Sequence, residues 1–249
     1  DPKFLTYSLV IEEGFEIDLL DKITSSAAKT ARDAGVLIVA GDTKVVNKNA
    51  ADKIFLITAG IGPVNPKWRP QAKNILPGDK VIVSGPIGDH EVAIVASREN
   101  FGIEGVPLSD CAPLNELLKP LWENVSGIRF MRDPTRGGLA TALNEIAGSA
   151  DAGIELKEEK IPVREGVRGI SELLGFDPLY LACEGRAVVI VAQEDAEKTL
   201  SILKSNPLGL MACEIGEVVS EPKRVFMRTR VGGTRIIDLP IGEQLPRIC

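Results

Sequence analysis

The first sixty residues combine short apolar runs with one long amphipathic stretch. Residues 5–11 and 54–60 have the composition of strands, and the run Val-Leu-Ile-Val-Ala at 36–40 is typical of a buried strand. Residues 16–34 carry apolar side chains at helical spacing, and Gly35 ends that pattern. The succession of strand, long helix and strand predicts a packed α/β unit.

A second series of elements follows a segment rich in Pro and Gly. Residues 62–78 have little periodicity, so we place a domain boundary at about Pro77. Beyond it, helices and strands in mixed order predict a second α/β domain with a mixed sheet. Helices are expected at 91–98, 114–122, 139–147, 163–174 and 194–203, and strands at 80–84, 128–131, 153–156, 186–192, 214–219, 224–227 and 234–238.

The periodic pattern ends after Leu239. The last ten residues, 240–249, hold two prolines and one glycine, which disfavour both a helix and a paired strand. We therefore predict three parts: residues 1–76 are the remaining part of an N-terminal α/β domain, 77–238 form a C-terminal α/β domain, and 239–249 form a flexible tail.

Composition argues against several classes of protein. The net charge of −6 disfavours a nucleic-acid surface, which usually needs a basic patch. No apolar run has the length of a membrane span, and the N-terminus lacks a signal-peptide pattern, so we expect a cytoplasmic protein without a membrane segment.

The four cysteines lie far apart, with no CxxC pair, which argues against a disulfide framework or a metal cluster. Cys111, Cys183 and Cys213 are interpreted as small buried hydrophobic residues. Cys249 is the last residue and is expected to be exposed. It does not match a prenylation box, in which the cysteine is fourth from the end. We interpret it as a thiol that is loaded in one place and delivered to another; the alternative is an accidental exposed cysteine.

The segment Gly41-Asp42-Thr43-Lys44 follows a predicted strand, where α/β proteins often place functional groups. Asp42 could hold Mg²⁺ beside nucleotide phosphates, since Mg²⁺ prefers oxygen ligands and keeps few protein ligands. Lys44 could face the phosphates as a point charge. The alternative is a simple turn, because Gly-Asp is a common turn sequence.

The segment Asp133-Pro134-Thr135-Arg136-Gly137-Gly138 lies between a predicted strand and a predicted helix. Two glycines and a helix start leave backbone N–H groups available to an anion, and Arg136 could pair with phosphate oxygens. The spacing is not that of a Walker A loop. The alternative interpretation is a helix cap with tight packing.

Two further residues are candidates for proton transfer. His90, the only histidine, follows Gly88-Asp89 at a strand end, although a single histidine is more often structural. Glu184 precedes an apolar strand, where partial burial would raise its pKa and make it a proton acceptor. A salt bridge between Glu184 and Arg186 is the alternative.

These motifs together resemble the HypE family of hydrogenase maturation factors. That family lies in a superfamily with aminoimidazole ribonucleotide synthetase, selenophosphate synthetase and thiamine-monophosphate kinase. The resemblance covers essentially the whole chain. It depends on Gly41–Val46, Gly88–His90, Asp133–Gly138, Glu184-Gly185 and, above all, the ending Pro246-Arg247-Ile248-Cys249.

The resemblance implies a reaction and its partners. A HypF-type carbamoyltransferase loads a carbamoyl group onto Cys249, ATP with Mg²⁺ drives its dehydration to a thiocyanate, and a HypC–HypD complex receives the cyano group. It also implies a homodimer formed through the N-terminal domain. Asp42, Thr43 and Lys44, together with Arg136, Gly137 and Gly138, would bind Mg-ATP, and Glu184 and His90 would move protons.

One departure concerns the beginning of the chain. The sequence starts Asp1-Pro2-Lys3, without Met, and the glycine-rich segment and acidic motif with which the family normally begins are absent. We interpret the sequence as lacking this N-terminal part. Material that truly lacks it is expected to show weak or no ATP turnover and a disturbed dimer.

Two other classes of function remain open at this point. Another ATP-dependent enzyme of the superfamily, such as a small-molecule kinase or a cyclising ligase, would keep its activity without Cys249. A non-catalytic adaptor would bind its partner after Cys249→Ala and without ATP.

Overall fold

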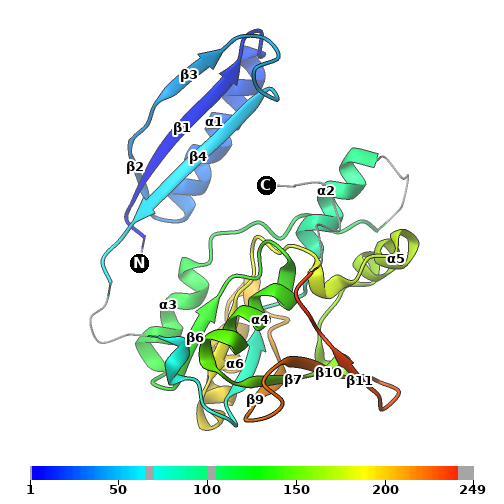
Figure 1. The fold of residues 1–249 in the computed structure, drawn as a ribbon. Coiled ribbons are helices and arrows are strands. Elements are labelled where there is room, and N and C mark those ends of the chain that lie inside the picture. The colour runs from blue at the N-terminus through cyan, green and yellow to red at the C-terminus, as the bar shows by residue number, and fades with distance from the viewer. Residues whose placement is uncertain (1, 65–69, 100–104, 241–249) are drawn as a thin grey trace. The chain divides into compact units, whose positions relative to one another are not determined.

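A computed structural model describes residues 2–64, 70–99 and 105–240 (Figure 1). Cys249 and most of the predicted tail lie outside these residues. The chain divides into two compact units, Asp1–Trp68 (unit 1) and Arg69–Cys249 (unit 2). The predicted boundary at Pro77 lies later than this division. Ile75 belongs to the hydrophobic core of unit 2, and the Gln71 N–H donates to the Arg129 carbonyl at 3.0 Å.

Unit 1 is a four-stranded sheet with one long helix. Strand β1 (Phe4–Glu12) is central, and β4 (Ile54–Ile61) runs antiparallel along one side of it. On its other side, β2 (Leu37–Ala40) and β3 (Thr43–Val46) follow one another, both parallel to β1. Helix α1 (Ile17–Asp33) connects β1 with β2 and lies on one face of the sheet (Figure 1).

Gly41 and Asp42 form the step between β2 and β3. A Cβ atom at Gly41 would lie 2.1 Å from the Tyr7 carbonyl oxygen, so only glycine permits this close passage over β1. The Leu9 N–H then donates to the Asp42 carbonyl at 2.8 Å, which continues the pairing with β1. The sequence pattern predicted that the strand ends at Ala40, and it missed β3. The pairing continues past Gly41 and Asp42 only because both β2 and β3 bond to β1, which is not visible in the local sequence.

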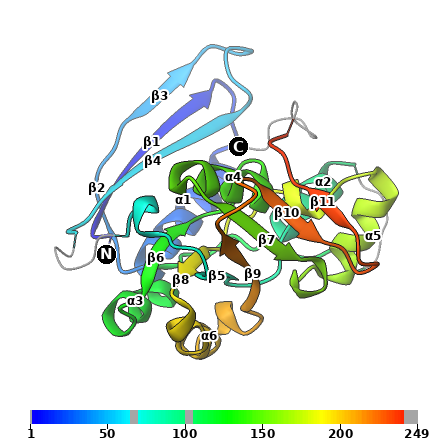
Figure 2. The same ribbon diagram turned by 60° about the horizontal axis from the view of Figure 1, so that its bottom comes forward.

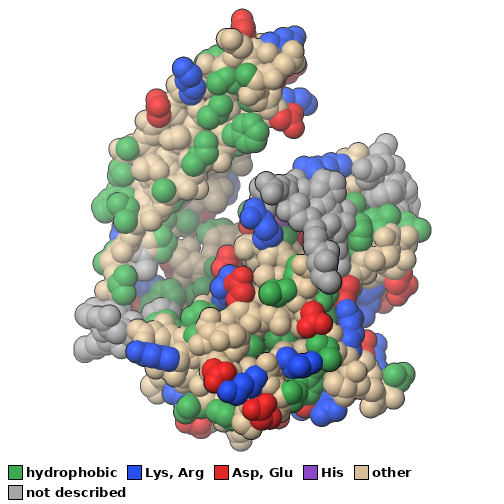
Figure 3. Space-filling view, viewed as in Figure 1, with side chains coloured by type: hydrophobic (Ala, Val, Ile, Leu, Met, Phe, Trp, Pro, Cys, Tyr) green, Lys and Arg blue, Asp and Glu red, His purple; other side chains and the backbone are tan. Residues whose placement is uncertain are grey.

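The prediction that 36–40 is a buried strand was wrong for most of its length. Val36 is buried, but all four residues of β2 are exposed. Most of β4 is exposed as well, including Phe55, Leu56 and Ile57. Figure 3 shows hydrophobic side chains gathered over the visible face of unit 1. The apolar composition of these strands predicts that other residues pack over them. Within the described part of unit 1, β2 and most of β4 are left exposed.

Unit 2 contains a seven-stranded mixed sheet in the order β11-β10-β7-β9-β5-β8-β6. Neighbouring strands are antiparallel except for the parallel pair β10 and β7. The strands are β5 (Lys80–Val83), β6 (Ile128–Arg132), β7 (Gly153–Lys157), β8 (Val188–Val191), β9 (Cys213–Val219), β10 (Val225–Arg228) and β11 (Thr234–Ile236).

Helices cover the sheet of unit 2. Leu139, Leu143 and Ile146 of α4 pack in one core with alternate residues of β5 and β8, while α6 packs on β5, β9 and α3 (Figures 1 and 2). This cover explains why β8 is apolar at every position. The helices are α2 (Asp89–Glu99), α3 (Asn115–Asn124), α4 (Gly138–Ala150), α5 (Glu165–Leu174) and α6 (Ala196–Lys204).

Short 3-10 helices connect several of these elements. They are η1 (Ala72–Asn74), η2 (Glu158–Lys160), η3 (Pro178–Tyr180), η4 (Gln193–Asp195) and η5 (Pro207–Gly209). The helices and strands predicted for unit 2 are present, with bounds that differ by a few residues, and the predicted α/β class is confirmed. Among the described residues, no helix has both the length and the apolar character required to cross a membrane.

Candidate functional site

Asp42, Thr43 and Lys44 all lie exposed on unit 1. The Thr43 N–H donates to Oδ1 of Asp42 at 2.9 Å, a local bond typical of a turn. Among the residues that the structure describes, no group of three or more His, Cys, Asp or Glu side chains could hold a metal ion. The role of Asp42 as a Mg²⁺ ligand stays a prediction.

His90 and Glu184 lie at one end of the sheet of unit 2. Strands β5 and β8 are antiparallel neighbours, with Val83 opposite Val188. The loop that leaves β5 toward His90 and the loop that enters β8 from Glu184 therefore lie at the same end. The two candidates lie 94 positions apart in sequence, and the pairing of β5 with β8 brings their loops together.

A short irregular segment contacts both loops. The Nδ1 atom of His90 lies 2.8 Å from the Ser109 hydroxyl oxygen. The backbone N–H of Glu184 donates to Oδ1 of Asp110 at 3.0 Å. The sequence singled out neither Ser109 nor Asp110, since no motif surrounds them.

Arg186 does not form the salt bridge with Glu184 that was the alternative interpretation. Its guanidinium pairs with two buried carboxylates: Nη2 lies 3.4 Å from Oδ2 of Asp89, and Nε lies 3.6 Å from Oδ2 of Asp110. Arg164 also pairs with Asp89. Burial nevertheless raises the pKa of Asp89, against the lowering effect of the two arginines. The partly exposed Glu184 carboxylate is thus not neutralised by Arg186.

Glu91 is a carboxylate that sequence reasoning missed. Burial raises its pKa, against a hydrogen bond from the Ala182 N–H and the charge of His90. Its position directly after His90 and the apolar composition of α2 are the only signals that the sequence offers.

The cysteines are only partly as predicted. Cys183 is fully buried, and burial raises the pKa of its thiol to about 12. Cys213 is half-buried. Cys111 is exposed, which corrects its assignment as a buried residue. The pKa of the Cys111 thiol is raised by desolvation and by the nearby carboxylates of Glu184 and Asp110, which disfavours its thiolate form.

The two glycines at the start of α4 have left-handed conformations, with φ of 72° at Gly137 and 60° at Gly138. A Cβ atom on Gly138 would lie 2.5 Å from the Leu181 carbonyl oxygen, and its N–H donates to the Thr135 carbonyl at 2.8 Å. At Gly138 the tight-packing interpretation therefore holds. Anion binding by this loop and Arg136 stays a prediction.

This glycine loop is a neighbour of the Glu184 loop. The Cys183 N–H donates to the Pro134 carbonyl at 3.1 Å. Three predicted motifs of unit 2, around His90, Arg136 and Glu184, thus belong to one connected region.

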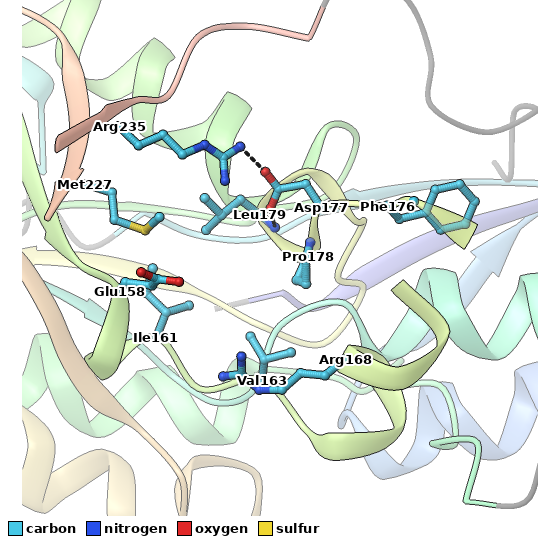
Figure 4. Close-up of a pocket in the computed structure, with 11 residues that line it drawn as sticks. Glu158, Ile161, Val163, Arg168, Phe176, Asp177, Pro178, Leu179, Met227 and Arg235 are labelled. Carbon is cyan, nitrogen blue, oxygen red and sulfur yellow. Dashed lines mark hydrogen bonds and ion pairs between the residues drawn. The ribbon is translucent and has the colours of Figure 1, made fainter. Parts of the chain in front are cut away.

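A cavity of about 430 Å³ lies elsewhere in unit 2 (Figure 4). Its lining includes Met227, Leu179 and Arg168, and it is bordered by the ion pair of Arg235 with Asp177. None of the predicted site residues lines it.

Comparison with known proteins identifies the relatives of this chain. Residues 77–228 match the family model described as AIR synthase related protein, C-terminal domain. The carbamoyl dehydratase HypE of Rhodobacter capsulatus is 45% identical over 249 residues, and that of Escherichia coli (strain K12) is 44% identical over 250. Each match covers all of this chain and 73% of the relative.

Solved structures agree with the sequence comparison. The crystal structure of Escherichia coli HypE has a TM-score of 0.96 and 43% identity, covering 100% of this chain and 76% of that one. A HypE–HypF complex matches with a TM-score of 0.93 and 46% identity, covering 96% of this chain and 78% of that one. HypE in complex with ATP matches at 0.95 and 43%, covering 100% and 76%. The chain therefore belongs to the HypE family of carbamoyl dehydratases.

Proposed function

We propose that this protein is an ATP-dependent carbamoyl dehydratase that converts a carbamoyl group on the Cys249 thiol into a thiocyanate. The product supplies cyanide ligands during the maturation of nickel–iron hydrogenases. The observation that carries the proposal is the pairing of β5 with β8, which puts His90 and Glu184 at one end of the sheet, in a chain 45% identical over its whole length to a carbamoyl dehydratase.

The reaction needs activation of an amide oxygen. The thiocarbamate oxygen is a poor leaving group, and transfer of the ATP γ-phosphoryl group to it makes it a good one. Loss of phosphate from carbon and of both protons from nitrogen then forms the C≡N bond. The balanced outcome is thiocarbamate plus ATP giving thiocyanate, ADP and phosphate, with the protein supplying position, charge and a proton acceptor.

Glu184 is the preferred proton acceptor. It is partly exposed, its backbone is held by Asp110, and its carboxylate is not paired with Arg186. His90 is the second candidate, held through Nδ1 by Ser109. A carboxylate and an imidazole at one end of the sheet can accept the two nitrogen protons in turn.

The motif around Asp42 in unit 1 is proposed to contact ATP. The ATP complex of a HypE with 43% identity supports nucleotide binding in this family. Mg²⁺, when bound, would neutralise phosphate charge, with Asp42 as its ligand and Thr43 and Lys44 beside the phosphates. Arg136 and Gly137 are proposed separately as phosphate contacts within unit 2; Gly138 is less suited to this role than the resemblance implies, because its N–H already donates to the Thr135 carbonyl.

Partners load and unload the carrier thiol. A HypF-type carbamoyltransferase would supply the carbamoyl group, which the HypE–HypF complex supports, and a HypC–HypD complex would accept the cyano group. A carrier cysteine must remain a free thiol between cycles, which is favoured in a reducing compartment, and we propose the cytoplasm.

A homodimer is proposed for unit 1. Strands β2 and β4 expose Leu37, Ile38, Phe55 and Ile57, a concentration of apolar surface that monomeric proteins seldom leave in water. A second copy of the same sheet is the proposed cover.

Intact mass spectrometry tests the reaction. The complete protein, incubated with carbamoyl phosphate, ATP and the carbamoyltransferase, should gain a carbamoyl group and then lose one water, both at Cys249. Cys249→Ala should show neither change, whereas Cys213→Ala, which removes a different thiol, should show both. ATP turnover and product formation that persist in Cys249→Ala would instead indicate another enzyme of the superfamily.

A further inference from the structure

The segment 106–114, between α2 and α3, has neither helical nor strand structure. It nevertheless buries a charged group, since the side chain of Asp110 has 0% exposure. A carboxylate removed from water costs free energy unless its oxygens are paired. The contacts of Asp110 therefore indicate which groups this segment holds in place.

Both oxygens of Asp110 point to the loop of the candidate base. Oδ1 accepts the Glu184 N–H at 3.0 Å, and Oδ2 lies 3.6 Å from Nε of Arg186. Between them, a Cβ atom on Gly185 would lie 1.7 Å from the Asp110 carbonyl oxygen. The two backbones thus touch with no side chain in between, so a displacement of Asp110 must displace Glu184.

The neighbouring residue holds the histidine. The Ser109 hydroxyl oxygen accepts the Cys111 N–H at 3.1 Å and lies 2.8 Å from Nδ1 of His90. This oxygen accepts the Cys111 N–H with one lone pair, and its second lone pair can accept from Nδ1–H, which leaves Nε2 unprotonated and able to take a proton. Ser109 thereby holds the orientation of the His90 ring and favours the tautomer that can act as a proton acceptor.

Arg186 forms a second connection between the two segments. Its Nε donates to the Pro86 carbonyl at 2.8 Å, and Nη2 pairs with Asp89, the residue before His90. The His90 loop and the Glu184 loop are thus joined twice, once through Arg186 and once through the pair Ser109 and Asp110.

We propose that Ser109 and Asp110 are positioning residues that fix the distance and orientation between His90 and Glu184 for removal of the nitrogen protons. This inference deepens the proposed function and depends on it. Neither residue needs to touch the substrate; each acts through the group that it holds.

The test is Asp110→Asn in the complete protein, with ATP-dependent thiocyanate formation on Cys249 as the activity. Asn keeps an acceptor for the Glu184 N–H but loses the charge that pairs with Arg186. A misplacement of about 1 Å can cost about 10²-fold in rate, so we expect kcat to fall by about 10- to 100-fold. The KM for ATP should change by less than about twofold, since the residue holds the proton acceptor and not the nucleotide.

Asp79→Asn is the matched control. Asp79 is also buried, accepts the Leu76 N–H at 2.7 Å and pairs with Arg129, whose Nε lies 3.3 Å away. It stands before β5, at the opposite end of that strand from Gly85 and His90. Asp79→Asn should lower the melting temperature without lowering kcat.

Ser109→Ala provides a second variant at an exposed position, where loss of folding is not expected. It should lower kcat and alter the pH profile of kcat, because Nδ1 of His90 loses its partner. The inference is overturned if a folded Asp110→Asn retains the kcat of Asp79→Asn, or if Ser109→Ala leaves both rate and pH profile unchanged. A wild-type protein that forms no thiocyanate would instead refute the proposed function.

Discussion

Strands β2 and β8 have nearly the same sequence character and opposite surroundings. Leu37–Ala40 reads Leu-Ile-Val-Ala, and Val188–Val191 reads Val-Val-Ile-Val. All residues of β8 have 0% exposure, whereas Ile38 in β2 has 43% and Leu37 has 64%. Apolar composition therefore indicates that a strand is suited to burial. It does not indicate whether the same chain or another chain buries it.

The difference follows from the neighbours of each strand. Strand β8 lies between β5 and β6, within a sheet that α4 and α6 cover. Strand β2 lies on the side of β1 and pairs only with its first residues. Unit 2 therefore covers its central strands with its own helices, whereas unit 1 is proposed to rely on a second copy.

The largest expected effect comes from a charge placed in the proposed dimer surface. Ile57→Asp, at a position in β4 that is 51% exposed, should be tolerated in the monomer but not in an apolar interface. We expect the molar mass from light scattering to fall from dimer to monomer. Leu210→Asp, at an exposed position of unit 2, should leave the mass unchanged. A monomeric wild type, or a dimer that survives Ile57→Asp, contradicts the proposed interface.

A smaller effect should separate the two strands in stability. Ile190→Ala in β8 removes fully buried methyl groups and should lower the free energy of unfolding of unit 2 by about 2–5 kcal/mol. Ile38→Ala in β2 should lower that of unit 1 by about 1 kcal/mol or less, because much of this side chain is already in water.

Both substitutions are best compared by urea denaturation in the Ile57→Asp background, where no partner covers unit 1. The two units need not unfold together, so each transition is followed separately. Equal losses for Ile190→Ala and Ile38→Ala would show that β2 is covered within the monomer.

The smallest effect concerns a loop of unit 1 that is held by an exposed carboxylate, in contrast to the buried Asp110 of unit 2. Glu12 accepts the N–H groups of Asn49 and Lys53, and these bonds lower its pKa from the ordinary 4.5. Because the pKa of Glu12 is lower in the folded protein than in the unfolded chain, the two bonds stabilise the loop fully at a pH above the unfolded pKa. This stabilisation is lost as the pH falls through the folded pKa.

Hydrogen exchange measures this effect locally. The protection factors of the Asn49 and Lys53 amides should fall as the pH drops below the ordinary glutamate pKa of 4.5. Glu12→Gln should give lower factors with little pH dependence. The global unfolding transition should hardly move, because the carboxylate is exposed. Protection that does not change between the wild type and Glu12→Gln would show that other contacts hold this loop.

Most of the elements of unit 2 were predictable, because helical and alternating periodicity are local properties of the chain. The main failure, the missed β3, occurred where Gly41 and Asp42 interrupt a strand that β1 holds together through hydrogen bonds. The motifs around His90, Arg136 and Glu184 were also recognisable, since each contains residue types that suit phosphate or proton chemistry at a strand or helix end.

The remaining site residues had no such signature. Asp110 lies 74 positions from Glu184, and Ser109 lies 19 positions from His90, so their roles depend on contacts that no local pattern encodes. The alternative interpretation, a pairing of Arg186 with Glu184, is not what the structure shows, because the guanidinium pairs with the buried Asp89 and Asp110. Cys111 was taken for a core residue although its segment leaves it exposed.

By itself, the sequence determined the α/β class, the order of the elements and the motifs that mark the family, because these depend on residue type and spacing along the chain. Only the tertiary structure decided which apolar strands are covered, which carboxylates share the Arg186 guanidinium and which residues hold His90 and Glu184. Those features depend on distances between atoms that are remote in sequence, and folding alone sets such distances.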